Sequence, residues 1–426
     1  MASPYPIRPV TEDDLLAVSA VHEHAFHTGP PSGPARERLD ARMEYERTFA
    51  ALDGGTIVGT AGSYGFRMRV PGALAAVAGV TLVGVLPTHR RRGILSSLMR
   101  RQLDDLRERG EAVAALFASE AVIYSRFGYG RASWQAGFSL RAGEGELAAG
   151  APADGALRLR IAEPRAARAE LAKVYETVLG ERPGFFARDE TWWDRALMDD
   201  PEKRAGASPL RCVLAEDTAG PRGYALFSGH ERWDQDALLA EFTIEVREVV
   251  TADPAATAAI WGDLLSRDLT TEFHIPMRPV DDPLLHLLAD PRRVRSRTTD
   301  ALWVRLVDVA GALAQRRYAC PVDVVIEVAD DGCDWNQGRW RLTTAAAGPP
   351  VPGTGGAAGF GATCERTTGL ADISLPVQAL GAAYLGGTRL GPLAAAGLVA
   401  ERRPGALTSL SAALSWDPAP WCPMMF

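Results

Sequence analysis

Lysine is almost absent from this chain of 426 residues, since it occurs only at Lys173 and Lys203. Nearly all positive charge is therefore carried by arginine. Together with the abundance of Ala and Gly, this is typical of a genomic composition bias and indicates nothing about function. The formal net charge of −7 argues against a general nucleic-acid partner and is compatible with a cationic one.

Cysteine is also scarce, and its pattern excludes two site types. The five cysteines are scattered and include no C-x-x-C pair, which disfavours both a disulfide framework and a zinc site. His22, His24 and His27 lie close together in the sequence, but no cysteine or carboxylate completes a ligand set. We therefore expect pocket or surface histidines and no metal. The cysteines are Cys212, Cys320, Cys333, Cys364 and Cys422.

Long apolar runs and a targeting signal are missing as well. No apolar run that is free of charges reaches membrane-spanning length, so we expect no membrane span. The first residues, Met1 to Pro6, lack the charged-then-apolar pattern of a signal peptide. Because the scattered cysteines are also expected to be reduced, these absences predict a cytoplasmic protein.

The chain is too long for one ordinary hydrophobic core, so two to four domains are expected. Alternating strand and helix patterns restart after the Gly- and Ala-rich stretch 142–155 and again near Thr298. These breaks predict units at 1–145, 156–295 and 298–426. A strand over 131–140 is expected to close the first unit. The order of strands and helices in the second unit resembles that in the first.

The most informative stretch runs from Gly79 to Leu95. An apolar strand over 77–86 leads into a triply basic turn, a glycine and an amphipathic helix. The first N–H groups of a helix lack internal partners and favour anions, and arginine forks suit phosphate. Gly93 permits close approach of a ligand. A solvated basic loop is the alternative, but this order of elements favours a site for a diphosphate-bearing ligand.

Two common phosphate motifs do not account for this turn. No Lys-Ser/Thr follows Gly93, unlike a P-loop, and G-x-G-x-x-G is absent. Arg90-x-x-Gly93-x-Leu95 is similar to the R/Q-x-x-G-x-G/A acetyl-CoA motif of the GCN5-related N-acetyltransferases (GNAT), with Leu95 in place of a small residue. The runs Val83–Gly93 and Ala118–Gly130 more closely resemble the enhanced intracellular survival (Eis) aminoglycoside acetyltransferases.

This resemblance covers the whole chain and implies an α/β (α+β) fold. It implies two tandem GNAT-like mixed-sheet domains, the first catalytic with the acetyl-CoA site and the second degenerate. A sterol-carrier-like α/β domain follows, and its C-terminal carboxylate enters the active site. The resemblance also implies that the strand ending at Val85 splays from its neighbour. The cofactor-binding residues that it implies are Val83, Gly84, Val85, Arg90, Arg91, Arg92, Gly93, Ile94, Leu95, Ser96, Ser119 and Glu120.

The resemblance further implies two catalytic groups. Tyr124 is implied to be the general acid that protonates the departing CoA thiolate. Without the resemblance, its local sequence would indicate only an aromatic side chain packed in a short helix. A phenol titrates near about 10 and a thiol near about 8.5, so positioning must assist the transfer. The terminal carboxylate of Phe426 is the general base. Its ordinary pKa of about 3.5 suits a base only if burial raises it, and docking for packing alone is the alternative.

The expected activity is direct transfer of an acetyl group from acetyl-CoA to a primary amine, without a metal. The amine is expected on an aminoglycoside, a polyamine or a lysine side chain. An acidic, aromatic substrate pocket is expected, with Phe26 and Glu401 as candidates and Glu190 and Asp194 as further carboxylates. The family association implies a homohexamer. The alternatives are a carrier of lipid or apolar ligands with a vestigial acetyltransferase domain, and a protein acetyltransferase whose middle domain recognises its partner.

Overall fold

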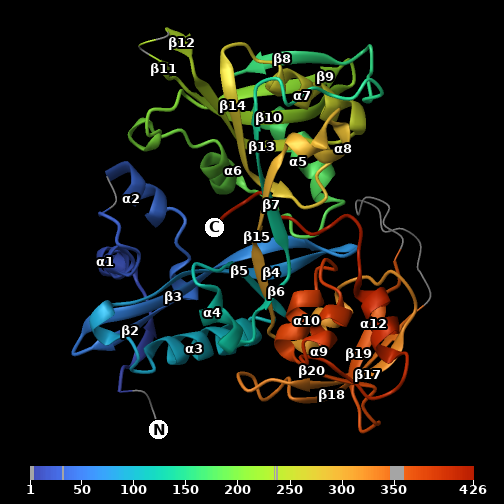
Figure 1. Ribbon diagram of the computed structural model, residues 1–426. Helices are drawn as coiled ribbons and strands as arrows, with labels where there is room; N and C mark the ends of the chain where they lie inside the picture. Colours follow the sequence, from blue (N-terminus) through green and yellow to red (C-terminus); the bar gives the residue numbers. More distant parts are fainter. Residues whose placement is uncertain (1–3, 31–32, 235, 237, 346–358) are drawn as a thin grey trace.

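The computed structural model describes residues 4–30, 33–234, 236, 238–345 and 359–426. Within these residues the strands form two seven-stranded sheets, a five-stranded sheet and a two-stranded ribbon. Figure 1 shows the first unit in blue, the second in green and yellow, and the third in orange and red, with the C-terminus between the first two.

The first sheet has the order β1-β2-β3-β4-β5-β16-β6, in which only β4 and β5 are parallel. Gly54 and Gly55 both have positive φ between β2 and β3, as a tight hairpin requires. The strands are β1 (Ile7–Pro9), β2 (Thr48–Asp53), β3 (Thr56–Val70), β4 (Ala73–Val85), β5 (Val113–Phe117), β6 (Gly130–Arg131) and β16 (Leu302–Leu306).

The helix predicted after Gly93 is present as α3, and it buries Leu98, Met99, Leu103 and Leu106 on one face. Among the residues that the structure describes, no helix combines the length and the apolar character needed to cross a bilayer. The helices of the first unit are α1 (Leu15–Phe26), α2 (Gly33–Asp40), α3 (Ile94–Glu108) and α4 (Ala121–Tyr124).

The second sheet has the order β15-β7-β14-β13-β10-β9-β8. Its strands are β7 (Trp134–Arg141), β8 (Arg158–Ala162), β9 (Arg211–Asp217), β10 (Gly220–His230), β13 (Phe242–Thr251), β14 (Thr270–Pro279) and β15 (Arg295–Asp300), with the ribbon β11 (Trp233–Asp234) and β12 (Leu239–Ala240). Its helices are α5 (Arg168–Leu179), α6 (Glu190–Ala196), α7 (Pro254–Leu265) and α8 (Leu284–Leu287).

Two strands cross between the units that the sequence pattern separates. The strand expected to close the first unit is β7, and it instead pairs with β14 and β15 in the second sheet. In return β16, from the start of the expected third unit, lies between β5 and β6 in the first sheet. Alternating burial identifies a strand but not its partner, so the pattern alone cannot assign β7 or β16 to a sheet.

The third sheet has the order β19-β18-β17-β20-β21. Its apolar core is continuous with that of the first sheet, since Val77 and Leu302 belong to the same buried cluster as Ile326 and Leu375. The elements are β17 (Asp323–Ala329), β18 (Gly338–Thr344), β19 (Ala362–Arg366), β20 (Ile373–Pro376), β21 (Ala400–Glu401), α9 (Val309–Ala314), α10 (Val377–Ala383), α11 (Leu390–Ala395) and α12 (Ala406–Leu414).

The chain after α12 returns to the other units. The backbone N–H of Trp421 donates to the carbonyl of Pro183 at 2.9 Å, and Arg182 donates to the carbonyl of Ala419 at 2.6 Å. The Trp421 ring packs edge-on against Phe185, with centroids 5.4 Å apart. The last residues are therefore anchored to the second unit by both hydrogen bonds and aromatic packing.

The contact between β6 and α10 predicts that Gly130→Ala destabilises the fold. A Cβ at Gly130 would lie 1.9 Å from the Gln378 carbonyl oxygen and 2.4 Å from the Ala382 nitrogen, which are backbone atoms. We expect overpacking of about 1–3 kcal/mol or more, seen as a lower midpoint of denaturant unfolding. Gly150→Ala is the control, because its Cβ would meet nothing within 4 Å. Equal midpoints for the two variants would contradict the close packing of this contact.

Candidate active site

The site begins at an irregularity in β4. The register between β3 and β4 shifts so that Leu82 and Val83 together oppose one residue of β3, and Leu82 has a φ of 52°. β4 pairs with β5 only through Ala78 and Gly79. The two parallel strands therefore separate beyond this point, as the resemblance implied, and the edge of β4 that faces β5 is unpaired near Val83, while Gly84 and Val85 still pair with β3.

A tight turn joins the end of β4 to α3. Arg91 and Gly93 both have positive φ, at 63° and 81°, and Gly93 caps the helix. A Cβ at Gly93 would meet nothing within 4 Å, so the backbone here is open to an approaching group. The first N–H groups of α3 lack helical partners and are available to an anion at this turn.

A cavity of about 680 Å³ lies between this turn and α4, and we call it the cofactor-side cavity. All of the predicted cofactor residues line it except Arg92. Arg92 instead donates to the Tyr5 hydroxyl at 3.1 Å, because the turn directs its side chain towards the N-terminal segment. The cavity is lined by Ala25, Phe26, Val83, Gly84, Val85, His89, Arg90, Arg91, Gly93, Ile94, Leu95, Ser96, Ser119, Glu120, Ile123, Tyr124 and Arg126.

A second cavity, of about 480 Å³, reaches the C-terminus, and we call it the tail-side cavity. It shares Phe26, Val83, Ser119 and Tyr124 with the cofactor-side cavity, so the two adjoin at these residues. It is lined by His22, Phe26, Val80, Thr81, Leu82, Val83, Phe117, Ala118, Ser119, Tyr124, Gln135, Asp300, Ala301, Met425 and Phe426.

Tyr124 is the last residue of α4 and is 7% exposed. Burial raises the pKa of its phenol, and a hydrogen bond with Ser119 opposes this rise. The phenol is therefore protonated at neutral pH. Because Tyr124 lies where the cavities meet, its hydroxyl proton is available to a group held between them.

Phe426 is held by aromatic side chains from two units. Its ring lies 5.1 Å from Phe66, 5.6 Å from Phe117 and 5.1 Å from Phe186, measured between centroids. Arg195 donates to the carbonyl of the preceding residue, Met425, at 3.1 and 3.2 Å. These contacts bring the end of the third unit to the wall of the tail-side cavity, beside β4 and β5 of the first.

His22, expected from the sequence to be a pocket or surface histidine, lines the tail-side cavity, although sequence analysis assigned it no role in the site. Its Nε2 lies 3.3 Å from the Thr60 hydroxyl, which donates to the Leu82 carbonyl at 2.8 Å. Its ring stacks on Phe26, with centroids 5.7 Å apart. Burial lowers the pKa of His22, so the ring is neutral. The spacing of four residues between His22 and Phe26 was the available signal, since it places both on one helix face.

Other predicted residues lie elsewhere. Glu401 is on β21 of the third unit, where its carboxylate accepts from the Leu407 N–H at 2.9 Å, and it lines neither cavity. The tail, rather than β21, returns to the first unit, so the structure does not bring Glu401 to this site. Glu190 has a side chain that is 94% exposed, and Asp194 accepts from Arg168 at 3.5 Å. Of the proposed substrate residues, only Phe26 lines the site.

Comparison with known proteins assigns the chain to a family. Residues 6–132 and residues 184–306 each match an acetyltransferase (GNAT) domain, and residues 309–423 match a sterol carrier protein domain. N-acetyltransferase Eis of Mycobacterium tuberculosis is 33% identical over 419 residues, which cover 96% of each chain. The chain belongs to the Eis family of GNAT N-acetyltransferases.

Further relatives agree with this assignment. An N-acetyltransferase of Streptomyces avermitilis is 43% identical over 422 residues, or 99% of each chain. The crystal structure of Eis1 from Mycobacterium abscessus superposes with a TM-score of 0.81 and 35% identity, covering 99% of this chain and all of that one. The predicted family and the fold of two GNAT domains followed by a sterol-carrier-like domain are confirmed, and this Eis-family chain is an N-acetyltransferase.

The half-buried His22 predicts a pH-dependent contribution to stability. Since its pKa is lowered in the folded protein, the unfolded chain binds a proton that the folded protein does not below about pH 6.5. The free energy of unfolding should therefore fall as the pH falls through this region. His22→Asn should reduce the difference between denaturant midpoints at acid and neutral pH. His24→Asn, an exposed change on the same helix, should leave that difference unchanged; equal effects would contradict this role.

Proposed function

We propose that this Eis-family enzyme transfers an acetyl group from acetyl-CoA to a primary amine by direct attack. The thioester would occupy the cofactor-side cavity, and the amine would enter through the tail-side cavity. The observation that carries this proposal is the junction of the two cavities at Tyr124 and Val83. An acid and the edge of β4 that is unpaired towards β5 lie there, with the C-terminus on the wall of the second cavity.

The cofactor-side cavity has the chemistry that a diphosphate requires. Among the described residues, neither Arg90 nor Arg91 forms an ion pair with a carboxylate, so both guanidinium groups are available. The open backbone at Gly93 and the start of α3 add N–H donors. GNAT domains generally use acetyl-CoA, and these groups would hold its diphosphate.

Each step of the transfer has a group in the site. The terminal carboxylate of Phe426 would take a proton from the acceptor ammonium, and the free amine would attack the thioester carbonyl. A backbone N–H near Val83 would stabilise the developing oxyanion. As the carbon–sulfur bond breaks, Tyr124 would donate its phenolic proton to the sulfur, and the second proton lost by the attacking nitrogen would restore the phenol. A phenol is a weaker acid than a thiol, so Ser119 would assist by orienting the hydroxyl.

The acceptor and the setting of the enzyme rest on family resemblance. An aminoglycoside, a polyamine or a lysine side chain would each present a primary amine to the tail-side cavity. The same resemblance supports a hexamer, and the scattered cysteines favour a cytoplasmic location. A lipid-carrier role has less support, because the third unit buries a charged side chain. Arg316 is 1% exposed and donates to the carbonyls of Tyr384 and Leu414.

The catalytic roles predict the effects of two changes on CoA-thiol release with acetyl-CoA and a panel of amines. Tyr124→Phe should lower kcat about 100-fold or more, because a positioned acid commonly contributes that much. Tyr129→Phe is the matched control, since this buried neighbour lines neither cavity. A loss below about tenfold for Tyr124→Phe would contradict its role.

The terminal carboxylate can be separated from the ring that carries it. Deleting Phe426 removes both, whereas appending one alanine keeps the ring and moves the carboxylate. Both changes should lower kcat at least about tenfold if the carboxylate is the base. If the appended chain keeps full turnover, Phe426 serves packing alone. Circular dichroism would check that both variants fold.

The basic turn predicts different roles for adjacent arginines. Arg91→Gln should raise the KM for acetyl-CoA about tenfold or more, as expected for loss of a charge-assisted hydrogen bond. Arg92→Gln should raise it much less, because Arg92 lies outside the cavity and contacts Tyr5. Steady-state kinetics with acetyl-CoA as the varied substrate would measure both. A larger effect for Arg92→Gln would contradict the assignment.

A further inference from the structure

The second unit repeats the strand arrangement that forms the cofactor side of the first. Strands β8, β9, β10, β13 and β14 follow one another in the second sheet as β1 to β5 do in the first, and β13 and β14 are likewise parallel. A register shift interrupts β13 as it does β4. The pairing of β13 with β14 ends at Glu245, so the two strands separate beyond it. A split between parallel strands is therefore present in both units.

The start of α7, which follows β13, differs from the start of α3. Asp253 caps α7 and accepts from the Ala256 N–H at 3.0 Å, and Pro254 in the first turn has no N–H to offer. Asp253 also accepts from Arg222 at 2.8 Å. The first unit instead presents the open backbone of Gly93 at this position. The second split thus carries a carboxylate of its own where the first accepts an anion.

The tail of the chain lies at this second split. A cavity of about 280 Å³ remains there, and we call it the socket. Pro418 and Trp421 form part of its wall, together with the end of β13 and the start of α7. Arg278 of β14 donates to the Val249 carbonyl of β13 at 2.8 Å, across the split, and its guanidinium lies 5.1 Å from the centre of the Trp421 ring. An arginine and a tail residue therefore close the split.

The contacts on both sides of the tail are themselves fixed within the second unit. Arg278 donates to Asp282 at 2.5 Å, and both residues are buried. Arg182 donates to the Ala419 carbonyl at 2.6 Å and pairs with Asp281 at 2.7 Å. Asp281 in turn accepts from the Ala419 N–H at 2.9 Å. These partners hold residues 418–421 by side chain and by backbone.

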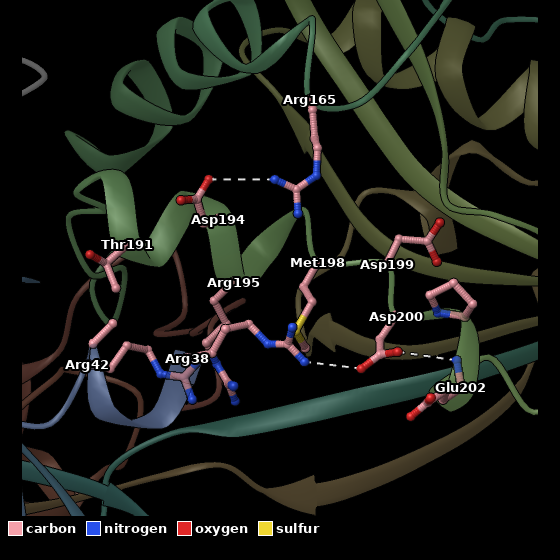
Figure 2. Close-up of a pocket in the computed structure, with 12 residues that line it drawn as sticks. Arg38, Arg42, Arg165, Thr191, Asp194, Arg195, Met198, Asp199, Asp200 and Glu202 are labelled. Atoms are coloured by element: carbon pink, nitrogen blue, oxygen red, sulfur yellow. Dashed lines mark hydrogen bonds and ion pairs between the residues drawn. The ribbon is translucent and has the colours of Figure 1, made fainter. Parts of the chain in front are cut away.

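The socket is close in sequence to the proposed catalytic base. Only four residues lie between Trp421 and Phe426. The Met425 carbonyl accepts from Arg195 of α6, and the Phe426 ring packs on Phe186. Arg195 also lines a separate cavity of about 610 Å³ between the first and second units, which Figure 2 shows. The second unit therefore holds the tail at both ends of its last six residues.

We infer that the socket positions the terminal carboxylate, and that Trp421, packed against Arg278, is the residue through which it does so. This inference rests on the proposed function, because the carboxylate must be placed accurately only if it acts as the base. Trp421 lines neither of the two cavities at the reacting groups, so it is a positioning residue. Displacing a reacting group by about 1 Å can slow a reaction about 100-fold.

A change at Trp421 tests this role in the full-length protein. Trp421→Ala should lower kcat about tenfold or more and leave the KM for acetyl-CoA within about twofold, because the cofactor side is untouched. Trp421→Phe keeps an aromatic ring and should restore most of the turnover. Trp340→Ala is the matched control, since it removes a similarly buried tryptophan of β18 that lines neither cavity. It should leave kcat within about twofold.

The pH profile separates positioning of a base from a general loss of structure. As the pH rises towards the pKa of the acceptor amine, more of the amine is free and needs no base. The ratio of the wild-type kcat/KM for the amine to that of Trp421→Ala should therefore fall towards one. The corresponding ratio for Trp340→Ala should stay constant across the same range of pH. A constant ratio for Trp421→Ala as well would overturn the inference.

Combining Trp421→Ala with the appended alanine gives a second readout. The appended residue has already moved the carboxylate, so Trp421→Ala should lower kcat little further in that chain, as for groups that act as a unit. Circular dichroism would check folding. If Trp421→Ala does not fold, Arg182→Gln removes one tail contact at a half-buried position. It should lower kcat about threefold or more, again only while the carboxylate is in its native place.

The outcomes distinguish this inference from the proposed function. If the appended alanine leaves kcat unchanged, the base role of the carboxylate fails and the inference fails with it. If the appended alanine slows turnover but Trp421→Ala and Arg182→Gln do not, the base role stands and the socket does not position the base. Equal losses from Trp421→Ala with and without the appended alanine would also overturn the inference, because the effect would not pass through the carboxylate.

Discussion

The short pairing of β4 with β5 is the constraint on which the site depends. Two parallel strands that stayed paired would use the backbone groups of β4 within the sheet and leave no opening. The bulge at Leu82 shifts the register of β4 against β3, and the pairing of β4 with β5 ends just before it, at Gly79. His22 lies against this bulge through Thr60, so α1 supports the opening as well.

The second requirement is that parts distant in sequence share their packing. β16 lies within the first sheet. Its buried residues belong to one apolar core that includes residues of both the first and the third unit. The tail then reaches back and places the Phe426 ring among aromatic residues of the first and second units. Because the site is assembled from contacts between units, no single unit could form it alone.

Arginine supplies the positive charge that lines two of the cavities. The residues of the basic turn face the cofactor-side cavity, whereas Arg42 and Arg195 face a separate cavity near the tail. The basic turn favours an anion although the chain as a whole is acidic, whereas the separate cavity has as many carboxylates as arginines in its lining. The net charge of the chain is therefore a poor guide to its binding partners. The charge of a cavity depends on which of its carboxylates are already paired with arginines.

Local patterns in the sequence determined the strand, basic turn and helix around Gly93, and the motif runs identified the family and its domain types. Those features depend on neighbouring residues, so periodicity and motif spacing are enough to predict them. Only the tertiary structure decided the exchange of β7 and β16, the place of His22 in the cavity wall, the outward turn of Arg92 and the position of Glu401. Each depends on which distant segments pack together, and alternating burial looks the same whichever partner a strand or side chain finds.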